Sequence, residues 1–127
     1  MEMVKNAVNW FEIPAADFGR ARTFYSAIFD FDMPEMTMGD SLMGFFLMDQ
    51  EGGGIGGAIV KGPWHKPSAD GSLVYLNGGE DLSVVLGRVE KAGGKVVVPK
   101  TAITPELGYF AMFIDTEGNR VALHSQG

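Results

Sequence analysis

The sequence contains no cysteine, which excludes disulfide bonds, thiolate metal ligands and cysteine nucleophiles. It has no apolar run near the roughly 20 residues of a membrane span, and its first residues include no stretch long enough for a signal peptide. Basic residues are few and scattered, with ten Lys and Arg against 16 Asp and Glu and a net charge of −6. We therefore expect a cytoplasmic protein that binds neither nucleic acid nor membranes.

The remaining composition is that of a globular protein. The 127 residues are 46% hydrophobic and 20% charged, which favours a single domain with one core and argues against disorder. Two residue types are unusually frequent, with 18 glycines and 8 methionines. Glycine indicates tight turns and close backbone approaches, and methionine indicates an adaptable apolar interior or pocket.

Two segments have the apolar spacing of amphipathic helices. One runs from Asp17 to Phe29 and the other from Asp81 to Ala92, and each begins at an aspartate that is a candidate N-cap. Gly93 and Gly94 follow the second segment and predict its end. The sequence therefore predicts one helix in each half of the chain.

Strand-like segments surround both helices in the same order. One precedes each helix and three follow it. The predicted strands are 8–13, 31–38, 42–48 and 55–61 in the first half, and 72–77, 95–101, 108–114 and 119–125 in the second. The turn before the last strand also repeats, as Asp49-Gln-Glu-Gly52 and Asp115-Thr-Glu-Gly118. The order is βαβββ, twice.

This repeat predicts two modules within one domain spanning residues 1–127. The first covers about 7–61 and the second about 72–125, and the linker 62–71 contains two prolines and two glycines. One helix covers one face of a four-stranded sheet, so the other face needs a partner. We expect an α+β fold whose two sheets curve around a shared cavity. The pattern leaves open whether the modules pair within one chain or between two chains.

Several motifs resemble the glyoxalase / bleomycin-resistance / dioxygenase family, also called the vicinal oxygen chelate superfamily. They include Phe11-Glu-Ile-Pro14 in the first half, then Val89-Glu-Lys-Ala-Gly-Gly-Lys-Val96 and Phe113-Ile-Asp-Thr-Glu-Gly-Asn119 in the second. Their order and duplication cover nearly the whole chain. The resemblance implies the paired βαβββ fold and a homodimer, but it does not imply one activity, because this fold carries many chemistries. Asp30 departs from the glycine that often follows the first helix in the family.

The resemblance also implies four positions for metal ligands, on the first and last strand of each module. The family usually has His, Glu or Gln there, whereas counting from the repeated aspartates places Trp10, Gly56, Val74 and Ala122 at these positions. None of these side chains coordinates a divalent metal. We therefore expect no metal site and no other cofactor, and the metal-dependent lyase and dioxygenase activities of the family are not expected.

Strand alternation extends the predicted cavity lining, because residues i and i+2 share a face. It adds Glu12 and His124 to the four positions counted above. The resemblance adds Phe46, Phe110 and Met112. The predicted ligand-binding residues are Trp10, Phe46, Gly56, Val74, Phe110, Met112, Ala122 and His124. Glu12 is the candidate catalytic acid or base, and the alternative is that it reaches solvent or pairs with Arg20 or Arg22. His65 is expected to be a loop residue without a chemical role.

These residues predict a mostly apolar and aromatic pocket. Our main expectation is binding of a small apolar or aromatic molecule without a metal. The alternative is a metal-independent lyase or isomerase that uses Glu12 as acid or base, together with His124 or a tyrosine. The sequence leaves open whether the protein is an enzyme and which ligand it binds.

Overall fold

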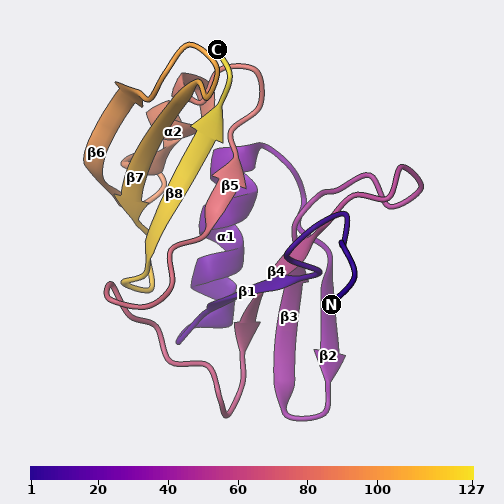
Figure 1. Ribbon diagram of the computed structural model, residues 1–127. Helices are drawn as coiled ribbons and strands as arrows, with labels where there is room; N and C mark the ends of the chain where they lie inside the picture. Colours follow the sequence, from indigo (N-terminus) through magenta and orange to yellow (C-terminus); the bar gives the residue numbers. More distant parts are fainter.

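The computed structural model describes all 127 residues as two four-stranded sheets and two helices (Figure 1). The elements are β1 (Phe11–Pro14), α1 (Phe18–Phe29), β2 (Glu35–Met38), β3 (Ser41–Phe45), β4 (Gly57–Lys61), β5 (Tyr75–Asn77), α2 (Ser83–Val89), β6 (Lys95–Ala102), β7 (Tyr109–Ile114) and β8 (Arg120–Ser125). The sheet orders are β1-β4-β3-β2 and β5-β8-β7-β6. The predicted α+β fold of two βαβββ modules is confirmed. Below, the first module is β1–β4 with α1, and the second is β5–β8 with α2.

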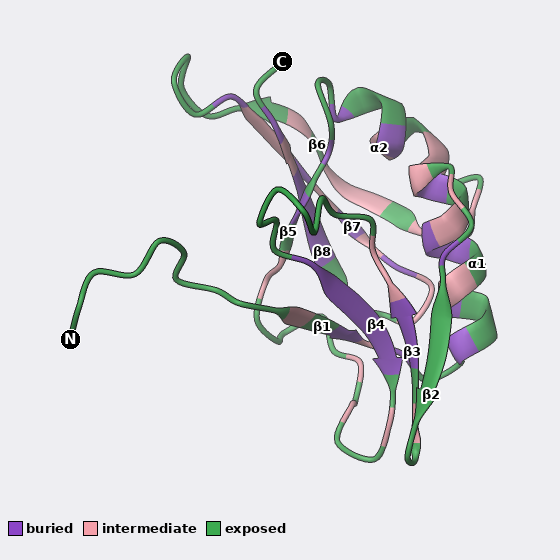
Figure 2. Cartoon of the chain, turned by 90° about the vertical axis from the view of Figure 1, so that its right-hand side faces the viewer, coloured by how far each residue is buried: buried purple, intermediate pink, exposed green.

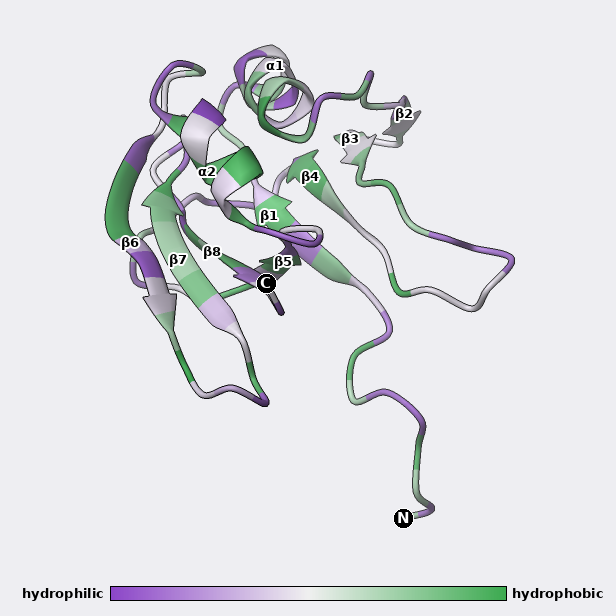
Figure 3. Cartoon of the chain, turned by 90° about the horizontal axis from the view of Figure 1, so that it is seen from above, coloured by the Kyte–Doolittle hydropathy of each residue, from purple (hydrophilic) through white to green (hydrophobic).

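The two sheets have the same pairing pattern. In each, the first strand runs parallel to the last, and the other neighbours are antiparallel. Parallel pairing needs a crossover between the strands, and the helix supplies part of it. Residues 1–10 precede β1 and are exposed, and Figures 2 and 3 show this segment extending away from the sheets. Neither helix has the length and apolar character needed to span a membrane.

Helix α1 begins and ends at aspartates. The Oδ1 atom of Asp17 accepts a hydrogen bond from the backbone N–H of Arg20 at 3.0 Å, as an N-cap does. The helix ends at Asp30, whose φ of 53° places it in the left-handed region. Aspartate is one of the few residues other than glycine that adopt this conformation. Asp30 therefore adopts the left-handed conformation that a glycine at this position would adopt.

Helix α2 is shorter than its apolar pattern predicts. It spans only Ser83–Val89, and Asp81 accepts from the N–H of Ser83, two residues later, at 2.9 Å. Several of its residues are β-branched valines, and Gly87 lies within it. Both features lower helix propensity. The Asp81 carboxylate also accepts from Lys100 Nζ at 3.0 Å. Together, hydrogen bonds from Ser83 and Lys100 lower its pKa to about 2.

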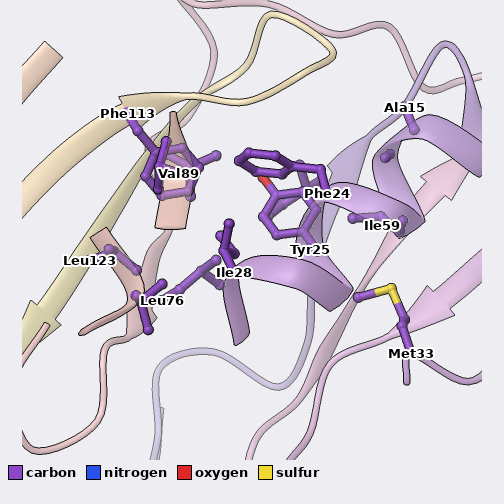
Figure 4. Close-up of a cluster of buried hydrophobic side chains, with 14 of the residues drawn as sticks. Ala15, Phe24, Tyr25, Ile28, Met33, Ile59, Leu76, Val89, Phe113 and Leu123 are labelled. Atoms are coloured by element: carbon purple, nitrogen blue, oxygen red, sulfur yellow. The ribbon is translucent and has the colours of Figure 1, made fainter. Parts of the chain in front are cut away.

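Both modules share one hydrophobic core. The rings of Phe24 on α1 and Phe113 on β7 lie 5.8 Å apart, and Ile28 lies in the same buried cluster as Leu76 and Leu123 of the second sheet (Figure 4). Both helices lie on one side of the strands (Figure 2). Helix α1 therefore packs against both modules, and each sheet keeps one face without a helix. We call this the open face of the module.

The turn between β7 and β8 fastens the second module to the beginning of α1. Asp115 is only 4% exposed, and its Oδ2 accepts from the Tyr25 hydroxyl at 2.8 Å and from Asn119 Nδ2 at 3.0 Å. Glu117 accepts from the backbone N–H groups before the helix, and Arg20 donates to it at 2.7 Å. Burial, followed by the charge of Asp115, raises the pKa of Tyr25 well above its usual value.

Candidate functional site

The open face of the first module carries a carboxylate on an apolar surface. The register places Glu12 opposite Ala58, and Ala58 opposite Phe45, so all three side chains share this face. Trp10 lies just before β1, and its ring is 6.1 Å from that of Phe45. The Trp10 ring also lies against Gly56, since a Cβ on Gly56 would stand 3.5 Å from it. Trp10, Glu12 and Gly56 are therefore close together.

His65 is the partner of Glu12, and sequence reasoning missed it. The Nε2 atom of His65 lies 2.7 Å from Glu12 Oε1, and Trp10 Nε1 donates to Glu12 Oε2 at 3.4 Å. No spacing pattern links positions 12 and 65, because the linker that carries His65 folds back over the sheet. Arg20 and Arg22, the alternative partners expected for Glu12, form hydrogen bonds elsewhere. Arg20 donates to the Glu117 carboxylate, and Arg22 donates to the Met33 carbonyl oxygen and the Asp32 carboxylate.

His124, which the alternative function would use together with Glu12, is hydrogen-bonded elsewhere. Its Nε2 atom lies 2.6 Å from the carbonyl oxygen of Leu107, at the loop before β7. His124 shares the open face of the second module with Phe110, and Met112 shares it with Ala122. Four of the predicted ligand-binding residues therefore lie together on the second sheet, while Trp10 and Glu12 lie on the first.

Phe46, a predicted ligand-binding residue, does not share a face with Glu12. Phe46 points to the helix side of its sheet, where its ring lies 5.2 Å from that of Tyr25 and 6.1 Å from that of Phe29. The hairpin register explains the difference. The N–H of Gly54 donates to the carbonyl of Asp49, whereas the N–H of Asp115 donates to the carbonyl of Asn119. The first hairpin thus holds one more residue, and a shift of one residue reverses the face.

Val74, another predicted ligand-binding residue, does not lie opposite Ala122. The register pairs Tyr75 with Ala122 and Asn77 with His124, and Val74 packs against the core. The prediction counted back from Asp81 on the assumption that it caps its helix as Asp17 does. The connection between β5 and Asp81 is one residue shorter than that between β1 and Asp17, because Tyr75 precedes Asp81 by six residues whereas Trp10 precedes Asp17 by seven. The four counted positions are therefore Trp10, Gly56, Tyr75 and Ala122.

An apolar cleft of about 1030 Å³ lies between the two modules. The first module contributes aromatic and aliphatic side chains, and the second contributes β5, the β5–α2 turn and the start of α2. Its lining includes Val8, Phe11, Phe29, Phe31, Phe46, Leu47, Ile55, Gly56, residues 73–81, Val84 and Val85. Three predicted ligand-binding residues, Phe46, Gly56 and Val74, line it. The many phenylalanines in the first half of the sequence indicated an aromatic pocket. The sequence did not show that these side chains converge on one cleft.

Sequence and structure comparisons place the chain in a known family. A sequence model of the Glyoxalase/Bleomycin resistance protein/Dioxygenase superfamily matches residues 7–123, so the chain belongs to this superfamily. No curated protein sequence matches it.

Solved structures with the same fold cover nearly all of the chain. One is TnmS3, an antibiotic binding protein from a Streptomyces species, with 24% identity, a TM-score of 0.67 and coverage of 99% of this chain and 100% of that one. A glyoxalase/bleomycin resistance protein from Albidiferax ferrireducens has 13% identity and a TM-score of 0.70, covering 96% and 100%. UcmS2 has 20% identity and a TM-score of 0.65, covering 98% and 100%. At these identities the similarity shows the fold alone.

The residues present do not fit the metal that the superfamily's metalloenzymes bind. The four positions assigned by register carry an indole, a hydrogen, a phenol and a methyl group, and no three His, Asp or Glu side chains lie close enough to hold an ion. Glu12 and His65 are the only such pair on the open face of the first module, and they are hydrogen-bonded to each other. Two mutually paired donors fall short of the three or four protein ligands of zinc sites.

Proposed function

We propose that the protein binds a small apolar or aromatic molecule in the cleft between its modules, without a metal. The cleft itself carries the proposal. Its volume of about 1030 Å³ is at the upper end of the range for small-molecule sites, and most of its lining is hydrophobic. The name of TnmS3, an antibiotic binding protein of the same fold, supports a binding role rather than a particular ligand.

The geometry of the cleft favours aromatic ligands. Phe46 meets Phe29 at 87° and Phe11 at 39°, so the three rings that line the cleft have different tilts. Aromatic rings prefer edge-to-face and offset contacts, and this arrangement offers both to a bound ring. Backbone groups of the β5–α2 turn and the carboxylates of Glu80 and Asp81 supply polar contacts at the other side.

Fluorescence titration with N-phenyl-1-naphthylamine, a neutral apolar probe, tests the proposal. We expect saturable binding with one probe per chain. Ile55→Glu, which places a charge at an exposed part of the lining, should weaken binding at least tenfold. Leu107→Glu is the matched control, because Leu107 is also exposed but lies away from the cleft. No saturable binding, or equal weakening by the two substitutions, would contradict the proposal.

A second candidate function is a metal-independent lyase or isomerase reaction with Glu12 as acid or base. The observation in its favour is the 2.7 Å contact with His65, which orients the carboxylate at an exposed face. As a base, Glu12 would take a proton from carbon beside a carbonyl, and the C–H electrons would move to the carbonyl oxygen. Exchange of such protons into D₂O, followed by NMR over a panel of small ketones, tests it. Glu12→Gln should abolish the exchange, and Glu35→Gln should not.

We also propose that the protein is a homodimer in the cytoplasm. Strand β2 is a free sheet edge whose four residues are all exposed, including Met36 and Met38. Such an edge offers unpaired backbone groups and apolar side chains to a second copy. Light scattering should give twice the chain mass, and Met36→Lys with Met38→Lys should give the monomer mass. A monomeric parent protein would overturn the dimer, and cell fractionation tests the location.

A further inference from the structure

The charged side chains that line the inter-module cleft are all acidic. Glu80 and Asp81, in the turn between β5 and α2, belong to the lining, and no lysine, arginine or histidine does. The same bias extends to the three segments that carry most of the lining, because residues 29–32, 46–56 and 73–85 contain no basic residue. The acidic residues of these segments are Asp30, Asp32, Asp49, Glu51, Glu80 and Asp81.

Only two of these carboxylates have a basic partner within the protein. Lys100 donates to Asp81 at 3.0 Å, and Arg22 donates to Asp32 at 2.9 Å. The carboxylates of the other four acidic residues form no ion pair. Glu80 is one of them, and it is exposed. Of the two carboxylates in the lining, that of Glu80 is therefore the one open to a bound cation.

The apolar walls of the cleft strengthen the effect of this charge. Charges of one sign beside walls of low dielectric constant focus the electric field and attract ions of the opposite sign. The phenylalanine rings belong to the first module, whereas Glu80 belongs to the second. A ligand with an aromatic ring at one end and an ammonium group at the other matches both sides. Because Glu80 is exposed, the ammonium group keeps part of its hydration there, which limits the cost of binding it.

We infer that the inter-module cleft selects aromatic ligands that carry a positively charged amine, with the ring against the phenylalanines of the first module and the ammonium group beside Glu80. The inference rests on the proposed function, because it names the class of ligand for the same cleft. Aromatic carboxylates are the least favoured ligands, since the charge that attracts an amine repels them.

Three probes that differ in charge test the inference with the full chain. Near neutral pH, 2-naphthylmethylamine is cationic, 2-naphthylmethanol is neutral and 2-naphthoate is anionic. Calorimetry measures their affinities, and competition with N-phenyl-1-naphthylamine shows whether they occupy the cleft. We expect the amine to bind about tenfold more tightly than the alcohol, and the acid to bind most weakly. Raising the salt concentration from about 0.05 M to about 0.5 M should reduce this preference, because salt screens exposed charges.

Two substitutions of exposed glutamates locate the preference. Glu80→Gln should reduce the preference for the amine by about threefold or more. Glu106→Gln is the matched control, because it removes the same charge outside the cleft lining, and it should leave the preference unchanged.

The outcomes separate this inference from the proposed function. Equal affinities for amine and alcohol, a preference that survives Glu80→Gln, or an amine that does not displace N-phenyl-1-naphthylamine would overturn the inference. If the neutral probe still binds saturably in these cases, the proposed function stands. If neither the neutral probe nor the amine binds, both fail.

Discussion

The two Asp-x-Glu-Gly turns are close in sequence but differ in their contacts. In the second module, Asp115 accepts from Tyr25, Asn119 and two backbone N–H groups, and Glu117 holds the start of α1. In the first module, Asp49 is exposed, and its side chain accepts only from the N–H of Gly52, at 2.9 Å. One turn therefore joins the modules, and the other remains at the surface. Figure 3 shows the loop that contains Asp49 extending from the sheet.

The helices explain the difference. Counted from the aspartate before each helix, α1 carries Arg20 and Tyr25 where α2 carries Val84 and Val89. Only α1 supplies the guanidinium and the phenol that bind a turn. The lining of the inter-module cleft includes Leu47 and Ile55 beside the unattached turn and residues 78–81 of the β5–α2 turn. The comparison teaches that the two copies of a repeated turn can differ in role, since the cleft lies beside the copy that does not bind a helix.

The largest expected effect comes from Asp115→Ala. It removes a buried acceptor and leaves the Tyr25 hydroxyl and two N–H groups without a partner, so we expect a loss of about 3 kcal/mol in the free energy of unfolding. Asp49→Ala is the matched control, with an expected loss of less than about 0.5 kcal/mol. Urea denaturation measures both. Similar losses would show that the two turns contribute equally.

Tyr25→Phe should cost about 1–2 kcal/mol, because it removes one buried hydrogen bond to a charged acceptor. It also tests a pH dependence. Burial and the Asp115 charge raise the pKa of Tyr25 in the folded state above its ordinary 10.0. The unfolded chain therefore loses the phenol proton first. Stability should be complete below about pH 10 and should fall as the pH rises above it. Thermal melts at pH 9–11 should show a smaller decline in the variant.

Val84→Arg should convert the open turn towards the closed one. Val84 is exposed and lines the cleft, and it occupies the position that corresponds to Arg20. We expect a guanidinium there to draw the Glu51 carboxylate across the cleft, as Arg20 binds Glu117. We expect affinity for N-phenyl-1-naphthylamine to fall about tenfold, which is about 1.4 kcal/mol. Val84→Gln controls for size and polarity without charge. Equal effects of the two changes would rule out turn closure as the cause.

The smallest expected effect is an acid dependence at Glu117. Burial acts to raise the pKa of Glu117, but hydrogen bonds from Arg20, the Asp17 N–H and Thr116, together with the Arg20 charge, outweigh it and leave the pKa below its usual 4.5. The resulting stability is present above about pH 4.5 and is lost as the pH falls through the folded-state value. Glu117→Gln should flatten this decline in melts between pH 3 and 6. An unchanged decline would assign it to other carboxylates.

Much of the fold follows from local patterns, while the faces of individual residues do not. The helix 18–29 and the strand order were predictable because apolar spacing reports local geometry. Phe46 and Val74 lie one residue away from the positions on the open faces, since the spacing does not show that the first hairpin is one residue longer or that the β5–α2 connection is one residue shorter. Glu12 was predicted as a candidate, but its partner was not. His65 lies 53 positions away, in a segment without periodicity.

The sequence by itself determined the repeated βαβββ order and the absence of metal-binding side chains at the counted positions, because both depend on residue identity and short-range spacing. Only the tertiary structure decided that His65 meets Glu12, that the phenylalanines of the first module converge on a cleft, and that one of two similar turns binds α1. These features depend on contacts between distant segments. Such contacts form according to how the two modules pack, which local preferences do not specify.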